Sequence, residues 1–405
     1  MTQSTTCAIV GGGPAGMVLG LLLARAGVEV TVLEKHADFL RDFRGDTVHP
    51  STLTLLDELG LWERFAALPK SKVERASLSN GGREVTVVDF GKLHQPHPYI
   101  AMVPQWDLLS LLAEAAEAEP TFTLRLRHEV TGLLREGSRV SGVRYRGPDG
   151  EGELSADVTV ACDGRWSVVR EQAGLRAREY PVPFDVWWFR LPREMDAQYS
   201  LVPRISAGRL LIMIPREGYF QIAYLIPKGS DAQLRARGLQ AFRDEVSGLA
   251  PEADVSQITS WDEVKFLDVR LNRLRRWHTD GLLCLGDAAH AMSPAGGVGI
   301  NLAVQDAVGA ATLLAEPLRR RSISERDLAA VQRRRMPPAV LTQGLQRIIH
   351  RRLMAPILQG RIKEPPAVLL DLVRRLPWLA SVPAYVIGVG VRPEHAPGFA
   401  RRLNR

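Results

Sequence analysis

The sequence predicts an α/β fold: a Rossmann-type nucleotide-binding domain with an inserted antiparallel β-sheet domain and a C-terminal helical region. Three observations support this fold class. Residues 6–34 have the pattern of a strand, a glycine-rich turn, a helix and a second strand. Two later strands, at 157–162 and 281–285, each lead directly into a loop that contains glycine and aspartate. Between these loops lie short strands separated by turn residues, which is typical of an antiparallel sheet.

The composition is that of a globular protein. With 405 residues, 45% apolar and 24% charged side chains, the chain is long enough for two or three domain-sized units. Its three cysteines are an odd number without metal-ligand spacing, so we expect reduced thiols, no metal site and a cytoplasmic protein. No uninterrupted run of about 18 apolar residues occurs, so we expect no membrane-spanning segment.

The net charge of +7 is unevenly distributed. From Arg319 to the last residue there are 18 basic and 5 acidic side chains, so the rest of the chain is acidic overall. A solvated helical face explains such a basic region, and so does attraction of an anion, either the phosphates of a nicotinamide cofactor or an acidic membrane surface. The basic residues lack interleaved aromatics and a recognisable module, so we expect no nucleic-acid binding.

The first predicted element is the β-turn-α-β unit at 6–34. Its turn has the G-x-G-x-x-G spacing at Gly11, Gly13 and Gly16. Gly11 permits the tight turn, Gly13 lets the backbone approach a pyrophosphate, and Gly16 lets the helix pack closely on the strand. Glu34 ends the second strand, where a carboxylate accepts hydrogen bonds from ribose hydroxyls and repels a 2′-phosphate. The unit therefore predicts a dinucleotide site that does not take NADP.

Two further motifs follow later strands. Residues 163–170 have the pattern D-G-x-x-S-x-x-R, and residues 286–290 read G-D-A-A-H. A glycine-rich stretch at 294–301 comes next and is followed by a helix expected at 302–315. Backbone N–H groups at the start of that helix would stabilise negative charge with little reorganisation.

These three motifs, in this order and at about these separations, resemble the flavin-dependent aromatic hydroxylases. These are the single-component FAD monooxygenases related to p-hydroxybenzoate hydroxylase, the group A flavoprotein monooxygenases. The resemblance covers roughly residues 5–320, the middle section matching mainly in its strand pattern. It implies FAD as cofactor and NADPH or NADH as transient reductant. It also implies that O2 forms a flavin C4a-hydroperoxide, from which one oxygen atom passes to an aromatic or polyketide-like small molecule.

The resemblance also implies roles for single residues. Glu34 would hold the adenosine ribose, and Asp287 would hold the ribityl hydroxyls. Asp163 lies in the motif that serves both FAD and the reduced nicotinamide. The predicted catalytic residues are Pro294, near the reacting carbon of the substrate, and Arg44, beside the pyrophosphate and the mobile flavin. The predicted cofactor-binding residues are Gly11, Gly13, Pro14, Ala15, Gly16, Glu34, Lys35, Arg44, Gly45, Gln105, Val130, Asp163, Gly286, Asp287, Pro294, Gly297, Gly299, Ile300 and Asn301.

The middle of the chain predicts a sheet rich in aromatic residues, with strands at 185–191, 209–214 and 219–226. Such a sheet would cover the flavin and supply a substrate-facing surface. Strand alternation places Tyr219 and Gln221 on one face and Tyr224 on the other, and it leaves open which face meets the cavity. The predicted substrate-contacting residues are Trp188, Tyr219, Gln221 and Tyr224.

We therefore predict an FAD-binding domain in two parts, 1–180 and 271–318, a substrate domain at 181–270 and a C-terminal helical region at 319–405. After Ala315 we expect helix to about Gly360, with breaks near Pro317 and at Pro337 and Pro338. The apolar stretch at 376–391 is compatible with packing over the substrate entrance, a subunit contact or a peripheral membrane contact. A homodimer and a separate flavin reductase both remain open.

Other functions use the same cofactor motifs. A flavin-dependent dehydrogenase or reductase and a flavin-binding carrier without enzymatic activity are two of them. A halogenase is a third, because residues 187–192 read W-W-F-R-L-P, similar to the halogenase stretch W-x-W-x-I-P with Phe189 at the second tryptophan. Lys70 or Lys72 would then be the halogenase lysine, although neither has a supporting motif. We expect His290 to be a structural residue satisfied by local backbone.

Overall fold

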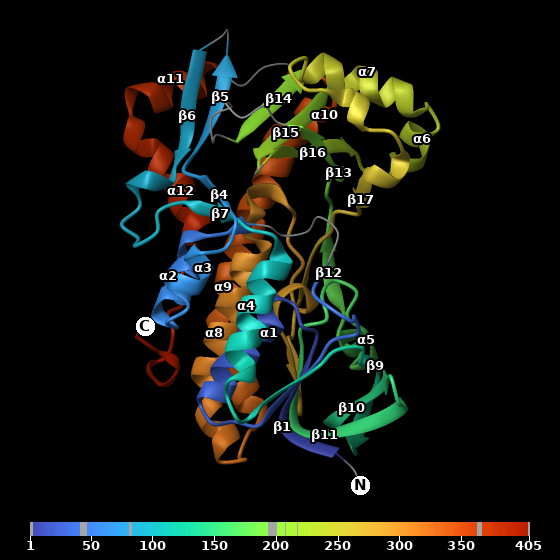
Figure 1. The fold of residues 1–405 in the computed structure, drawn as a ribbon, viewed down its shortest axis with the longest axis vertical. Helices are drawn as coiled ribbons and strands as arrows, with labels where there is room; N and C mark the ends of the chain where they lie inside the picture. Colours follow the sequence, from blue (N-terminus) through green and yellow to red (C-terminus); the bar gives the residue numbers. More distant parts are fainter. Residues whose placement is uncertain are drawn as a thin grey trace.

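The computed structural model describes residues 3–40, 47–80, 83–192, 201–206, 208–216, 218–362 and 367–403. Two predicted site residues, Arg44 and Gly45, lie outside these described residues. In Figure 1 one body, built on a mainly parallel sheet, occupies the lower half of the molecule, and an antiparallel sheet occupies the upper half.

The lower body is built on an eight-stranded sheet. Its five parallel strands lie in the order β8 (Phe122–Arg125), β2 (Val30–Leu33), β1 (Gln3–Val10), β11 (Gly150–Ala161) and β20 (Leu282–Cys284). The remaining three strands are antiparallel: β19 (His278–Thr279) at the edge, and β10 (Arg139–Gly147) with β9 (Glu129–Glu136) on the first half of β11. The apolar runs of β1 and β2 suit central parallel strands, which are covered on both faces.

Four long helices pack beside this sheet (Figure 1). They are α1 (Pro14–Arg25), α4 (Gln105–Glu117), α8 (Val298–Arg319) and α9 (Glu325–Ile349), and α1 contacts both α4 and α8 while α9 packs on α8. By length and composition alone, the stretch Ala295–Arg319 is apolar enough to cross a membrane. Most of it is buried inside the protein, as expected of a core helix.

One of the two helix breaks predicted from prolines occurs, and the other does not. Pro317 lies inside α8, which continues to Arg319, and Pro337 and Pro338 lie inside α9. Each proline removes one helical donor, a local cost that packing can exceed. In α9 the buried side chains of Arg335 and Gln343, on either side of the prolines, anchor the helix to the core. The predicted break near Pro317 is confirmed, because α8 ends at Arg319 and α9 begins at Glu325, whereas the predicted break at Pro337 and Pro338 is wrong.

The upper body is a five-stranded antiparallel sheet, which confirms the predicted insertion. Its strand order is β14 (Val202–Ser206), β15 (Arg209–Pro215), β16 (Tyr219–Pro227), β13 (Phe184–Pro192) and β17 (Lys265–Leu267). One face packs on α7 (Leu239–Leu249), with Trp187, Phe189 and Tyr224 around Phe242. The other face packs on the end of α9, the π-helical turn His350–Met354 and α10 (Ala355–Leu358).

The two bodies are joined by a short ribbon and bridged by a hairpin. In the ribbon, β12 (Ala177–Tyr180) pairs antiparallel with β18 (Leu271–Leu274), where the chain leaves and re-enters the lower body. The hairpin of β5 (Arg75–Asn80) and β6 (Arg83–Asp89) reaches the upper sheet through a bridge between Ala76 and Leu201. This hairpin was not predicted. Neither was a small sheet with the strand order β3 (Thr47–Val48), β7 (Ile100–Met102) and β4 (Ser71–Val73).

The remaining helices flank these smaller sheets. Helix α2 (Pro50–Glu58) and the short α3 (Trp62–Ala66) follow β3. Near the C-terminus, α11 (Ala367–Arg375) and α12 (Ser381–Gly388) contact β6 and lie at the upper left in Figure 1.

Candidate active site

The three predicted motifs meet at the carboxyl ends of adjacent parallel strands. The backbone N–H of Gly11 donates to the carbonyl of Leu33 at 2.8 Å, and that of Cys162 donates to Val10 at 2.8 Å. Leu285, just after β20, donates to Ala161 at 2.9 Å. Backbone hydrogen bonds therefore hold the ends of β2, β1, β11 and β20 side by side. In open α/β sheets this edge is where ligands bind.

The glycines of the first loop have the conformations that their spacing predicts. Gly11 has a φ of +104°, and a Cβ there would lie 2.5 Å from the carbonyl oxygen of Cys162. A Cβ on Gly16 would lie 2.0 Å from the carbonyl oxygen of Gly11, so any side chain would push α1 off the strand. Gly13 caps α1, and its Cβ position has no heavy atom within 4 Å. The loop is thus closely packed at Gly11 and Gly16 and open at Gly13, where the free N–H groups of α1 begin.

Glu34 is buried at the end of β2 and fixed by the first loop. Its Oε2 accepts from the N–H of Gly12 at 2.9 Å, and its Oε1 accepts from the N–H of His36 at 2.9 Å. Glu34 therefore lies at the end of β2 beside the glycine loop, where the family has the acid that contacts the adenosine ribose. Of the other residues predicted nearby, Lys35 is exposed and Val130 belongs to the apolar core.

The second motif contains a buried acid with an unused acceptor atom. Oδ2 of Asp163 accepts from the N–H of Val169 at 3.3 Å. Oδ1 is buried and has no hydrogen-bond partner in the part of the chain that the structure describes. Burial raises the pKa of the Asp163 carboxyl. An acceptor left without a partner is costly, so this atom suits a hydroxyl supplied by a ligand.

Two arginines join the second motif to the third. Arg165 Nη2 lies 3.3 Å from Oδ2 of Asp287, and both side chains are partly exposed. Arg170 donates to the carbonyls of Ala288 at 3.0 Å and Arg165 at 2.8 Å. Arg170 is the last residue of D-G-x-x-S-x-x-R, so the pattern contained this side chain, but its partner is visible only in the structure.

The glycine-rich stretch at 294–301 forms a turn into α8. Gly297 caps α8 with a φ of +65°, and its carbonyl accepts from Thr47 Oγ1 at 3.1 Å. Oδ1 of the buried Asn301 accepts from Ser51 and Thr52, both at 2.8 Å. The first N–H groups of α8, near the half-buried Gly299 and Ile300, point away from the helix without helical acceptors.

His49 was not predicted and connects this turn to the C-terminal region. Its Nε2 lies 3.0 Å from the carbonyl oxygen of Gly297, and its Nδ1 lies 2.8 Å from that of Ile387 in α12. Burial lowers the pKa of His49 to about 4, so the ring is neutral at physiological pH. Helix α12 therefore packs directly against the glycine turn. No signal in the sequence links residues 49 and 387.

Pro294 is half-buried in a loop that α9 holds from behind. The Nε2 of Gln346 donates to the carbonyls of Ser293 and Ala295, both at 2.9 Å. His350 Nε2 lies 2.9 Å from Ser293 Oγ. Gln105, another predicted cofactor residue, is half-buried at the first position of α4.

A buried chain of charges lies beneath the third motif. His290 Nε2 is 2.5 Å from Asp306 Oδ2, and Arg335 Nε is 3.0 Å from Asp306 Oδ1. Arg335 continues to Glu394 at 3.1 Å, which also pairs with Arg334 at 2.7 Å. His290 therefore has the structural place we expected, but its partner is a carboxylate from α8 rather than local backbone.

The upper sheet divides the four predicted substrate residues between its faces. Trp188 belongs to the same apolar cluster as Ala295, next to Pro294. Gln221 lies opposite Arg190, and Tyr219 lies opposite Pro192, which places both on the face of Trp188.

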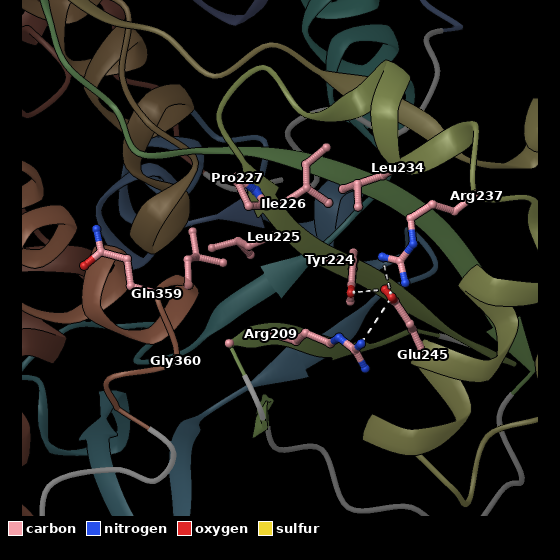
Figure 2. A pocket seen from close by; sticks show the side chains of 12 residues that line it. Arg209, Tyr224, Leu225, Ile226, Pro227, Leu234, Arg237, Glu245, Gln359 and Gly360 are labelled. Atoms are coloured by element: carbon pink, nitrogen blue, oxygen red, sulfur yellow. Dashed lines mark hydrogen bonds and ion pairs between the residues drawn. The ribbon is translucent and has the colours of Figure 1, made fainter.

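Tyr224 lies on the other face, so the structure does not bring it to the other three. Its hydroxyl donates to Glu245 at 3.0 Å, and Arg209 and Arg237 also contact that carboxylate (Figure 2). These residues line a separate cavity of about 300 Å³ between the sheet, α7 and α10. The role predicted for Tyr224 in contacting the substrate is not supported by this position.

The residues that the structure describes fit FAD. The first loop leaves open space above Gly13, where a pyrophosphate would lie. Oδ1 of Asp163 is a buried acceptor without a hydrogen-bond donor among the described residues, and a hydroxyl of the flavin's ribityl chain can supply that donor. The start of α8 presents N–H groups and the positive end of a 22-residue helix dipole toward the same edge.

The lysines considered for a halogenase have other partners. Lys70 donates to the carbonyls of Phe65, Ala66 and Leu68 at the end of α3. Lys72 is exposed, and its ammonium lies 4.6 Å from the centre of the Tyr99 ring.

Comparison with known proteins gives a family match over most of the chain. The model of the FAD binding domain family matches residues 4–343. A 6-methylpretetramide 4-monooxygenase from Streptomyces rimosus is 35% identical over 385 residues, covering 93% of this chain and 91% of its own length.

Solved structures show the same fold at lower identity. The Pseudomonas aeruginosa protein pqsL, a probable FAD-dependent monooxygenase, has a TM-score of 0.75 and 21% identity, covering 91% of this chain and 100% of its own. The myxobacterial chondrochloren halogenase CndH has a TM-score of 0.76 and 18% identity, covering 98% of this chain and 99% of its own.

Proposed function

Because the chain belongs to the FAD-binding family of aromatic flavoprotein monooxygenases, we propose that it hydroxylates an aromatic, polyketide-like small molecule with O2 and NAD(P)H. FAD is its cofactor, and when bound it supplies the redox chemistry of oxygen transfer. The observation that carries the proposal is the meeting of three nucleotide-binding motifs at one edge of the parallel sheet. The substrate class rests on the Streptomyces relative, which is named for a pretetramide.

The residues at this edge would hold the cofactor along its length. Glu34, held at the end of β2 by the N–H groups of Gly12 and His36, would contact the adenosine ribose. Asp163 Oδ1 and the partly exposed Asp287 accept hydroxyls of the ribityl chain. The N–H groups at the start of α8 stabilise negative charge on the pyrimidine edge of the flavin with little reorganisation.

The substrate would lie between Pro294 and the upper sheet. Trp188 shares a cluster with Ala295, and Gln221 and Tyr219 extend from the same face of the sheet. This face of the sheet combines an aromatic side chain with one amide and one phenol, which suits a polycyclic phenol or quinone. We assign residues 181–270 as the substrate domain on this basis, with Arg44 and Pro294 as candidate catalytic residues.

An exposed tryptophan supports the use of a nicotinamide reductant. Trp166 lies in the second motif and is 61% exposed, and the guanidinium of Arg270 is 4.0 Å from the centre of its ring. A flat ring beside a cation, three residues from Asp163, suits the base and phosphates of a dinucleotide that binds only transiently.

The test is oxidation of NADH or NADPH by the FAD-loaded protein across a panel of aromatic polyketides and simple phenols. We expect substrate-stimulated oxidation and a product that contains one atom from isotope-labelled O2. Protein that does not take up FAD, or that oxidises the nicotinamide without ever forming an oxygenated product, would contradict the proposal. The first outcome argues for a different cofactor, and the second for a flavin reductase. No oxidation of the nicotinamide with any compound of the panel would favour a carrier.

A pair of tryptophan variants tests the reductant site separately. Trp166→Ala should raise the KM for NAD(P)H about fivefold or more, because stacking on an aromatic ring is lost. Trp378, which is 59% exposed and lies outside the three motifs, provides the matched control Trp378→Ala. Equal KM values for both variants and wild type would place the reductant elsewhere.

The alternative functions predict other products. A dehydrogenase or reductase would convert its substrate equally well without O2, and a halogenase would incorporate bromide in place of oxygen. Anaerobic and bromide-containing reactions on the same panel separate these outcomes from hydroxylation.

A further inference from the structure

Three arginines from different parts of the chain surround one tyrosine ring at the junction of the two bodies. The guanidinium carbons of Arg178, Arg273 and Arg347 lie 5.4 Å, 5.5 Å and 4.7 Å from the centre of the Tyr180 ring. Arg178 and Arg273 are paired opposite each other on β12 and β18, and Arg347 comes from α9. We call these residues the Tyr180 cluster.

None of the three guanidinium groups forms a salt bridge with a carboxylate of the described chain. Arg273 donates to neutral acceptors, at 2.6 Å to Gln343 Oε1 and at 2.9 Å to the Tyr180 hydroxyl. The nearest acid in sequence, Glu179, lies on the opposite face of β12 and accepts from Asn272 at 2.9 Å. In α9 and the turn after it, residues 328–362 contain seven arginines and no acidic residue.

An arrangement of this kind is unfavourable by itself. Three like charges around one ring repel each other, and a single aromatic ring offers each cation only a modest attraction. Arg178 is exposed, while Arg273 and Arg347 are half-buried, so water screens the repulsion only in part. Other arginines of the same helix do have a carboxylate partner, since Arg334 and Arg335 both form salt bridges with Glu394. A bound anion would supply the charge that the Tyr180 cluster lacks.

We propose that Arg178, Arg273 and Arg347 form a binding site for a dianionic phosphoryl group. Guanidinium groups bind phosphoryl oxygens in pairs of parallel hydrogen bonds, and three of them match a dianion better than a monoanion. Two sources carry this chemistry: the 2′-phosphate of NADPH and free inorganic phosphate. The first source rests on the proposed use of a nicotinamide reductant, whereas the second does not.

The position of the cluster gives such a site a connection to the active site. Gln343 binds Arg273 and also donates to the carbonyl of Ala291 at 3.1 Å. Gln346, next to Arg347, holds the carbonyls of Ser293 and Ala295 on either side of Pro294. An anion on the cluster would therefore lie close behind the loop that carries Pro294.

The experiment measures binding to the FAD-loaded protein by calorimetry in low-salt buffer free of phosphate. The probes are inorganic phosphate, NADP⁺ and NAD⁺, with potassium chloride at matched ionic strength. Arg178→Gln and Arg347→Gln should each weaken binding of the phosphoryl probe by about tenfold, because a charge-assisted hydrogen bond is lost. Arg176→Gln removes an equally exposed charge just before β12 and should change the affinity less than about twofold.

The probes distinguish the two sources and the failure of the proposal. NADP⁺ that binds more tightly than NAD⁺ and competes with phosphate identifies the dinucleotide. Phosphate that binds while NADP⁺ and NAD⁺ bind equally and do not compete identifies the free ion, and this result stands even if the protein uses no nicotinamide. Equal affinities of wild type and both variants, or an effect of chloride equal to that of phosphate, would overturn the proposal.

Discussion

Helix α9 contributes arginines to two clusters that differ in how their charges are balanced. Around its middle, Arg335 lies between Asp306 and Glu394, and all three side chains are almost completely buried. Toward its end, Arg347 joins two other arginines around Tyr180 and meets no carboxylate among the described residues. The first cluster is complete within the chain and holds α8, α9 and the C-terminal segment together. The second is incomplete, which is what a site for an external anion requires.

The largest expected effect comes from breaking the complete cluster. Asp306→Asn keeps the shape of the side chain but leaves Arg335 and His290 facing a neutral amide in a buried place. We expect a loss of about 3–5 kcal/mol in the free energy of unfolding, as for other buried pairs deprived of one partner. Urea denaturation of the FAD-loaded protein measures it.

The control for that variant is Asp149→Asn, an exposed carboxylate in the turn between β10 and β11. It should leave stability unchanged. A loss below about 1 kcal/mol for Asp306→Asn would mean that the complete cluster contributes little, and the contrast between the two clusters would fail.

The next largest expected effect is that of pH on stability through His49, a buried side chain that contacts no carboxylate among the described residues. His49 is completely buried between two carbonyls, and its pKa is lowered to about 4 from an ordinary value of 6.5. The unfolded chain binds a proton below pH 6.5 while the folded chain does not, so stability should fall as the pH drops through this window. The full shift corresponds to roughly 3 kcal/mol.

Comparing His49→Gln with wild type isolates this contribution. The variant should show a flatter dependence of unfolding free energy on pH between neutral pH and about pH 4. His350, whose pKa burial also lowers to about 4, keeps part of the slope in both proteins. Identical slopes would show that His49 binds its proton in the folded protein as readily as in the unfolded chain. Burial would then not lower the pKa of this histidine.

The salt bridge between Asp287 and Arg165 is more exposed than the complete cluster, and its carboxylate provides a test of cofactor binding. Asp287 contacts Arg165 at 3.3 Å and is 30% exposed. Asp287→Ala should weaken FAD binding by about 1.5–3 kcal/mol, since hydroxyls of the ribityl chain lose a charged acceptor. Fluorescence titration of the apoprotein with FAD measures the change, with Asp149→Ala as control. Purification of the variant with a full complement of FAD would contradict the role proposed for Asp287.

The smallest expected effect has the opposite sign. In phosphate-free, low-salt buffer, Arg347→Gln should stabilise the protein by a few tenths of a kcal/mol, because it removes repulsion from the Tyr180 cluster. Adding phosphate should stabilise wild type and not the variant. Thermal denaturation in both buffers provides the measurement. Destabilisation of the variant in phosphate-free buffer would indicate that Arg347 packs as an ordinary structural residue.

Those parts of the site that depend on local backbone conformation could be predicted from the sequence. Gly11 and Gly16 are required by a turn and a close helix contact, each formed within six residues. His49 and Ile387 meet Gly297 only through tertiary packing, which no spacing encodes. Strand alternation separated Tyr224 from Gln221 correctly, but which face meets the site depends on where α7 packs. The break predicted at the prolines of α9 does not occur, because the buried side chains of Arg335 and Gln343 stabilise the helix by more than each missing helical hydrogen bond costs.

The buried charge cluster also sets an order for biosynthesis. The strands of the parallel sheet are complete once residue 284 has been made, yet Arg335 acquires its last partner only with Glu394. Until the ribosome has extruded that segment, Arg335 has only one of its two carboxylate partners, and Ile387 of α12 has not yet met His49 beside Gly297. The nucleotide site should therefore mature only after residues 387 and 394 have left the ribosome.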